Sequence, residues 1–118
     1  MLQRTVVALL ACTLLAPAAF AHAILVDSQP ASGGSVPAGT VNMTFRYNSR
    51  IDRDRSRLTL TKPDQSQVVL PIVPAGAPNV IETDATLTAP GAYVVRWQVL
   101  AVDGHITRGD VPFTVTGH

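Results

Sequence analysis

The stretch that decides the fold reads YVVRWQVLAV over residues 93–102 and is followed at once by Asp103, Gly104 and His105. It predicts the longest strand of the chain, with Trp97 inside it, because branched and aromatic residues are favoured in strands. The next apolar segment, residues 111–115, alternates around Phe113 and predicts the last strand. The chain therefore closes with two strands joined by a short polar loop.

The same kind of pattern extends back toward the N-terminus. Further strands are predicted at residues 23–26, 41–45, 58–61, 68–70 and 80–87. Pro71 and Pro74 follow the fourth of these, which should be short or lie at a sheet edge. No window has helical periodicity. Six or seven short strands in about 100 residues predict an all-β Greek-key β-sandwich.

Side-chain type separates the expected core from the expected surface. The strand patterns place Met43 and four aromatic residues in the core: Phe45, Tyr93, Trp97 and Phe113. Residues 31–35 are rich in turn formers. The arginine-rich residues 50–57 predict a solvated turn, with a docking patch for a partner as the alternative.

The first 21 residues have the pattern of a secretory signal. Arg4 precedes an apolar run over residues 6–15, and Ala19 and Ala21 are the small residues before a cleavage point. Cleavage there leaves residues 22–118 as one exported domain, expected to be soluble, periplasmic and monomeric. An alternative cut before Cys12, giving a lipidated N-terminus, stays open.

Charge and cysteine content narrow the class of protein. The chain has nine basic and eight acidic side chains, and loss of Arg4 leaves eight of each. A neutral domain has no electrostatic footprint for nucleic acid or an anionic membrane. Cys12 is the single cysteine and leaves with the signal, so a disulfide is not expected and packing alone must stabilise the domain.

The histidines suggest a metal site. The chain has three: His22, His105 and His118. If cleavage follows Ala21, His22 offers its free α-amine as well as its ring, and the two can close a small chelate. His118 is expected to belong to a loose tail.

Asp103 and His105 supply the rest of the predicted site. Residues two apart in extended backbone share a face, and Gly104 between them permits a bulge. With His22 they make a set of nitrogens and one carboxylate, which suits Cu(II), although ligand type alone leaves zinc possible. An Asp-x-His pair is also a common feature of turns, so a purely structural role stays open.

The mature sequence resembles the CopC family of periplasmic copper-binding proteins over almost its whole length. The matching segments are residues 22–25 with Pro30, Pro37 with 41–45, 91–97, 102–105, and Gly109 with 113–115. The resemblance implies a Greek-key β-sandwich or barrel of cupredoxin or immunoglobulin-like type. It also implies that this domain binds one Cu(II) ion through His22, Asp103 and His105. It further implies a role in copper resistance, or in supplying an inner-membrane partner of the CopD type.

The chain departs from the family pattern at three places. Arg46, Tyr47 and Asn48 stand where many relatives have a glutamate, which removes a further acidic contribution. Residues 62–79 contain no methionine, whereas some relatives carry a methionine-rich loop for Cu(I). The resemblance thus implies a member that binds Cu(II) only. Ile106 stands where relatives often have a proline directly after the histidine.

Three functions follow from these patterns. The leading one is a Cu(II) carrier that is not an enzyme, since both internal histidines are committed and no Ser-His-Asp triad can be written. The second is a secreted copper oxygenase with a histidine brace, as in lytic polysaccharide monooxygenases. The third is an immunoglobulin-like interaction module without metal.

Overall fold

The computed structural model describes residues 22–74 and 76–117, and all its regular elements are strands. The strands are β1 (Leu25–Gln29), β2 (Gly34–Pro37), β3 (Gly39–Tyr47), β4 (Ile51–Thr61), β5 (Gln67–Leu70), β6 (Val80–Leu87), β7 (Gly91–Ala101) and β8 (Ile106–Thr116). Across these residues, no helix long and apolar enough to cross a membrane is found.

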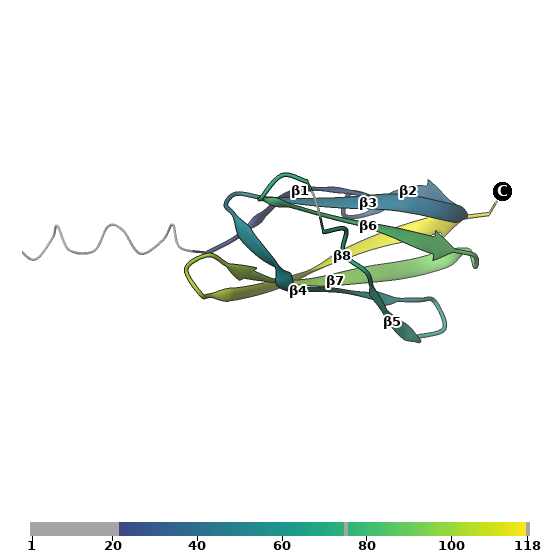
Figure 1. Cartoon of the computed structure of the whole chain (residues 1–118). Helices are drawn as coiled ribbons and strands as arrows, with labels where there is room; N and C mark the ends of the chain where they lie inside the picture. The colour runs from purple at the N-terminus through teal and green to yellow at the C-terminus, as the bar shows by residue number, and fades with distance from the viewer. Residues whose placement is uncertain (1–21, 75, 118) are drawn as a thin grey trace, which may run out of the picture.

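The strands form two sheets that face each other (Figure 1). One has the order β1-β3-β6 and the other β2-β8-β7-β4-β5. All neighbours are antiparallel except β2, which runs parallel to β8. The predicted all-β Greek-key sandwich is confirmed, and β5 is short and at an edge, as its following prolines indicated.

The sequence prediction missed β2. Residues 31–35 were expected to be a turn, but only their first part turns, with Gly33 at φ 80° and the Gly34 N–H donating to the Ala31 carbonyl. The chain then pairs with β8 from Gly34 onward. This pairing joins segments far apart in the chain, and the side chains of β2 are at most half-buried. The sequence around β2 therefore has no hydrophobic pattern from which a strand could be predicted.

The prediction of a solvated turn at residues 50–57 is wrong. Residues 51–57 form the first part of β4, whose pairing with β7 is irregular between Asp52 and Arg57. Within the irregularity, the Ser56 hydroxyl donates to the Asp52 carbonyl, and Arg53 Nη2 donates to the carbonyls of Ala77 and Val80 at 2.8 and 3.1 Å. A bulged strand can thus carry a dense run of charges, because its outward positions are solvated and Arg53 bonds to backbone.

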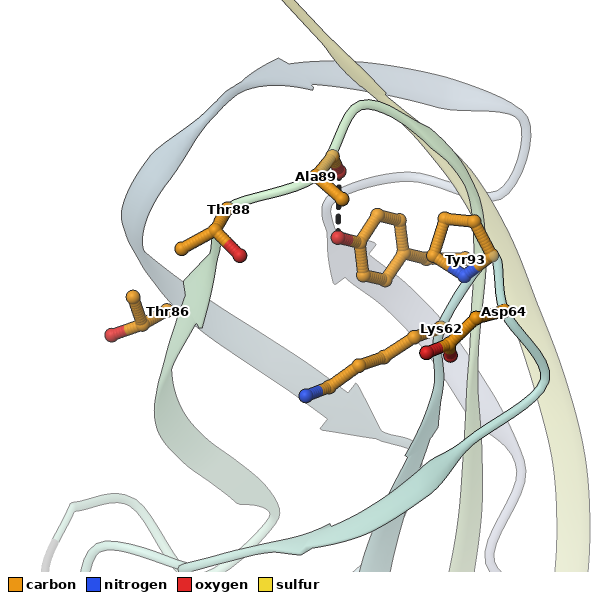
Figure 2. Close-up of a pocket in the computed structure, with 7 residues that line it drawn as sticks. Lys62, Asp64, Thr86, Thr88, Ala89 and Tyr93 are labelled. Atoms are coloured by element: carbon orange, nitrogen blue, oxygen red, sulfur yellow. Dashed lines mark hydrogen bonds between the residues drawn. The ribbon is translucent and has the colours of Figure 1, made fainter.

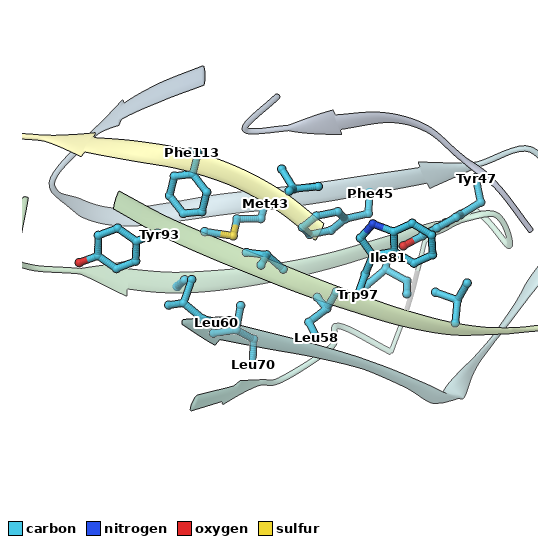
Figure 3. Packing of buried hydrophobic residues seen from close by; sticks show 14 of the residues in the cluster. Met43, Phe45, Tyr47, Leu58, Leu60, Leu70, Ile81, Tyr93, Trp97 and Phe113 are labelled. Carbon is cyan, nitrogen blue, oxygen red and sulfur yellow. The ribbon is translucent and has the colours of Figure 1, made fainter. Parts of the chain in front are cut away.

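The core lies between the sheets (Figure 3). The five residues predicted to be core are buried, which confirms that part of the prediction: Met43, Phe45, Tyr93, Trp97 and Phe113. Tyr47 joins them and meets Trp97 edge to face, with ring centroids 5.3 Å apart. Burial raises the pKa of the Tyr47 phenol.

Trp97 lies directly over β8. A Cβ built on Gly109, its partner in the register, would stand 2.4 Å from the indole Cζ2. Only glycine leaves room for the ring at this point of the strand. The glycine therefore lets the largest core side chain pack flat against the neighbouring backbone.

Candidate metal site

The candidate site lies at one end of the sandwich, where two distant segments meet. One is the start of the described chain, residues 22–24, which leads into β1. The other is the loop between β7 and β8, which carries Asp103 and His105. Figure 1 shows this end opposite the end at which the C-terminus emerges.

The loop between β7 and β8 is a tight hairpin connection. The Gly104 N–H donates to the Ala101 carbonyl at 2.9 Å, and the Ala101 N–H donates to the His105 carbonyl at 2.8 Å. Gly104 has φ 91°, a left-handed conformation that favours glycine, and it lies in the loop of residues 102–105 between the two strands. The Asp-Gly pair is thus required first of all by the turn.

Asp103 bonds to His105 through both of its carboxylate oxygens. Oδ1 accepts from the His105 backbone N–H at 3.1 Å, and Oδ2 accepts from its ring Nδ1 at 2.9 Å. The two side chains approach as predicted, but the reason given for it is wrong. Asp103 lies in the turn and not in extended backbone, so the turn and not strand alternation brings them together.

These bonds have an electrostatic consequence. Two hydrogen bonds from His105 hold the pKa of Asp103 below its usual range. The bond from the backbone N–H has the larger effect, and the bond from the ring has the smaller one. The carboxylate is therefore ionised at neutral pH. Since it occupies Nδ1 of His105, the other ring nitrogen, Nε2, is the one left for a metal.

His22 lies beside His105. The centroids of the two imidazole rings are 4.8 Å apart, and the rings meet edge to face at 76°. Both side chains are exposed to solvent. The fold therefore gathers the three residues predicted from the sequence at one accessible place.

Two residues that the sequence prediction did not single out contact the segment that carries His22. The Thr107 hydroxyl donates to the Ala23 carbonyl at 2.7 Å. Asn48 Oδ1 accepts from the Ile24 N–H at 2.8 Å, and the Asn48 N–H donates to the Ile24 carbonyl at 3.0 Å. Nothing in the sequence marks them, because the Asn48 bonds depend on the pairing of β1 with β3 and the Thr107 bond depends on how the two sheets come together.

The residues at hand fit a divalent ion once one group moves. In residues 22–74 and 76–117, no group of three or more His, Cys, Asp or Glu side chains is already placed to hold a metal. The two imidazoles are in position, but both Asp103 oxygens bond to His105. Rotation of this carboxylate away from Nδ1 would free it as a third donor.

The remaining sequence predictions concern residues 46–48 and the two ends of the chain. Residues 46–48 bring no carboxylate to the site: Arg46 pairs with Asp27 at 3.6 Å, and Asn48 holds the Ile24 backbone. The cleavage point after Ala21, the alternative at Cys12 and the tail residue His118 lie outside the described residues.

A pocket at the other end of the sandwich is separate from this site. It has a volume of about 260 Å³ and is lined by residues that include Lys62, Thr88 and Tyr93. Figure 2 shows the Tyr93 hydroxyl donating to the Ala89 carbonyl, at 2.7 Å. Neither histidine of the metal site lines this pocket.

Comparison with known proteins decides the family. The model of the CopC domain matches residues 25–116, which include Asp103 and His105 and begin just after His22. The chain belongs to the CopC domain family. The resemblance noted in the sequence is thereby confirmed.

Relatives of this CopC-domain chain match along nearly its full length. Copper resistance protein C of Xanthomonas campestris pv. juglandis is 29% identical, with 94% of this chain and 93% of that protein covered. Protein YobA of Escherichia coli K12 is 28% identical, with 95% and 93% covered.

Solved structures agree with the fold. CopC from Methylosinus trichosporium OB3b superposes with a TM-score of 0.75 at 31% identity, over 82% of this chain and 96% of that one. PcoC from Escherichia coli, described as a methionine-rich copper resistance protein, reaches 0.63 at 22% identity, over 81% and 100%. The second likeness supports the fold alone.

Proposed function

We propose that this chain is an exported Cu(II)-binding protein of the periplasm that holds one copper ion as cargo and is not an enzyme. The observation that carries the proposal is the meeting of His22 and His105, whose rings lie 4.8 Å apart. Membership of the CopC domain family, with a copper resistance protein among the relatives, supports copper as the metal.

The donor set consists of His22, Asp103 and His105. Cleavage after Ala21 gives His22 an α-amine next to its ring, so that this residue alone supplies two nitrogens. His105 supplies a third nitrogen, and Asp103 supplies a carboxylate oxygen by turning away from the His105 ring. Three nitrogens and one oxygen match the tetragonal preference of Cu(II).

The sulfur content favours Cu(II) over Cu(I), which prefers thioether and thiolate ligands. In the described part of the chain the methionine is Met43, and it is fully buried in the core. It cannot reach the exposed histidines. The donors that this site offers are thus nitrogen and oxygen atoms, a set that favours Cu(II).

The role we assign is copper homeostasis, either as resistance through sequestration or as delivery to an inner-membrane transporter of the CopD type. Both histidine side chains are exposed, so a partner can reach the ion directly. Asp103 argues against oxygen chemistry, because a carboxylate ligand takes the position that an oxygenase keeps open.

A copper titration followed by EPR tests the proposal on protein that begins at His22. We expect one Cu(II) per chain with nitrogen hyperfine splitting. A variant with one extra residue before His22 should lose most of its affinity, because the α-amine is moved away from the ring. The matched control has one extra residue after His118, and equal affinity in the two variants would contradict the proposed ligands.

A further inference from the structure

We infer that Thr107 and Asn48 are positioning residues that fix His22 beside His105 before any metal arrives. The inference deepens the proposed function and rests on it, because it explains how this chain prearranges the site. It is carried by hydrogen bonds to one peptide unit, the one that joins Ala23 to Ile24.

The two side chains bond to opposite sides of that peptide unit. Thr107 Oγ1 donates to its carbonyl, at 2.7 Å, and Asn48 Oδ1 accepts from its N–H, at 2.8 Å. A peptide unit is planar, so bonds to both of its polar groups fix the orientation of the whole plane. His22 is attached to this plane through the two backbone dihedrals of Ala23.

Ala23 itself is held in place. Its side chain is completely buried in the core, while His22 before it and Ile24 after it are exposed. With the methyl group buried and the following peptide fixed on both sides, little freedom remains between the core and the His22 Cα, from which the ring extends. The backbone of residues 23 and 24 is therefore held as part of the sandwich.

The side chains of Thr107 and Asn48, which we call the two clamps, come from different sheets. Thr107 lies in β8 of the five-stranded sheet, two residues after His105, and Asn48 follows β3 of the three-stranded sheet. Thr107 thus ties the His22 segment to the same strand that leads out of the His105 loop. This short connection links the backbone before β1 to the strand next to His105.

Asn48 also bonds through its backbone, and this separates its two contributions. Its N–H donates to the Ile24 carbonyl, at 3.0 Å, a contact that any residue except proline can make. The side-chain oxygen adds the second bond, which Asn or Asp can supply but Ala cannot. Asn48→Ala therefore removes one clamp and leaves the strand pairing in place.

The experiment compares Thr107→Val and Asn48→Ala with the wild-type protein starting at His22. We expect Cu(II) affinity to fall about 10- to 100-fold in each, as is typical when a partner that orients a ligand is lost. In the metal-free protein, NMR should show a weaker NOE between the two imidazole rings and faster hydrogen exchange at the Ile24 amide. Thr107→Ser keeps the hydroxyl and should restore all three values.

Thr116→Val is the matched control. Thr116 lies in the same strand, and its hydroxyl donates to the Val36 carbonyl at 3.3 Å, near the far end of β8. The control removes the same kind of bond and should change neither the copper affinity nor the ring NOE. An equal loss of affinity in Thr107→Val and Thr116→Val would mean that Thr107 acts only through general stability.

The outcomes separate the inference from the proposed function. If the wild type does not bind Cu(II), the proposed function fails. The ring NOE and the exchange of the Ile24 amide in the metal-free variants still test whether Thr107 and Asn48 position His22. If the wild type binds and both variants keep its affinity, NOE and exchange rate, the inference is wrong. Should Thr107→Val fail to fold, Asn48→Ala decides by the same readouts.

Discussion

The imidazoles of His22 and His105 meet edge to face, with their centroids 4.8 Å apart, although one precedes the first strand and the other precedes the last. We expect His22→Ala and His105→Ala each to lower Cu(II) affinity by more than the roughly 100-fold that loss of an outer partner can cost. Isothermal titration and EPR would measure this. The control is His118→Ala, which should bind copper like the wild type. A large loss of Cu(II) affinity in this variant would mean that His118 is a ligand, which contradicts the proposed site.

Asp103→Asn tests the carboxylate apart from the turn. The amide oxygen can still accept from the His105 backbone N–H, so the hairpin should keep its shape. The negative charge is lost, and Cu(II) affinity should fall. NMR of the Gly104 and His105 amides checks the turn, and unchanged copper affinity with an intact hairpin would mean that Asp103 only shapes the loop.

Copper binding should weaken on acidification between about pH 8 and pH 5. Imidazoles and the α-amine must be deprotonated to bind the ion, so protons compete with it. Asp103 does not cause this loss, because its hydrogen bonds from His105 hold its pKa below the usual range and keep it ionised over that interval. An affinity that stays flat over the interval would exclude the nitrogen ligands.

Gly109→Ala should destabilise the fold without touching the metal site. The added methyl would stand 2.4 Å from the Trp97 ring, and the overpacking should cost about 1–3 kcal/mol in the free energy of unfolding. For a domain of this size, that lowers Tm by roughly 4–8 °C per kcal/mol. Gly117→Ala is the control, since nothing lies within 4 Å of a Cβ there.

Metal binding should raise stability in a concentration-dependent way. A ligand at a hundredfold excess over Kd stabilises the native state by about 2.7 kcal/mol. Melting curves with and without Cu(II) measure this. A Tm that does not move would favour the interaction module without metal over the copper carrier.

Local patterns were sufficient to predict most strands. Residues 80–87 were predicted as a strand and form β6 with the same bounds, and Met43 and Trp97 were placed correctly in the core. Alternation of side chains is a property of neighbouring residues, so it can be read without knowledge of the partner strand. The segment at residues 50–57 misled, because a run of arginines looks alike in a solvated turn and in a bulged strand.

The sequence by itself determined the class of fold, the buried aromatics and the residue types for a metal site, since these depend on composition and spacing. The local turn decided that Asp103 bonds to the ring of His105. Only the tertiary structure decided that His22 reaches that ring. It also decided the parallel pairing of β2 and the clamps from Asn48 and Thr107. The Thr107 bond joins residues 84 positions apart and the Asn48 bond residues 24 apart. The Thr107 bond forms only when the two sheets pack face to face, and the Asn48 bond forms only when β1 pairs with β3.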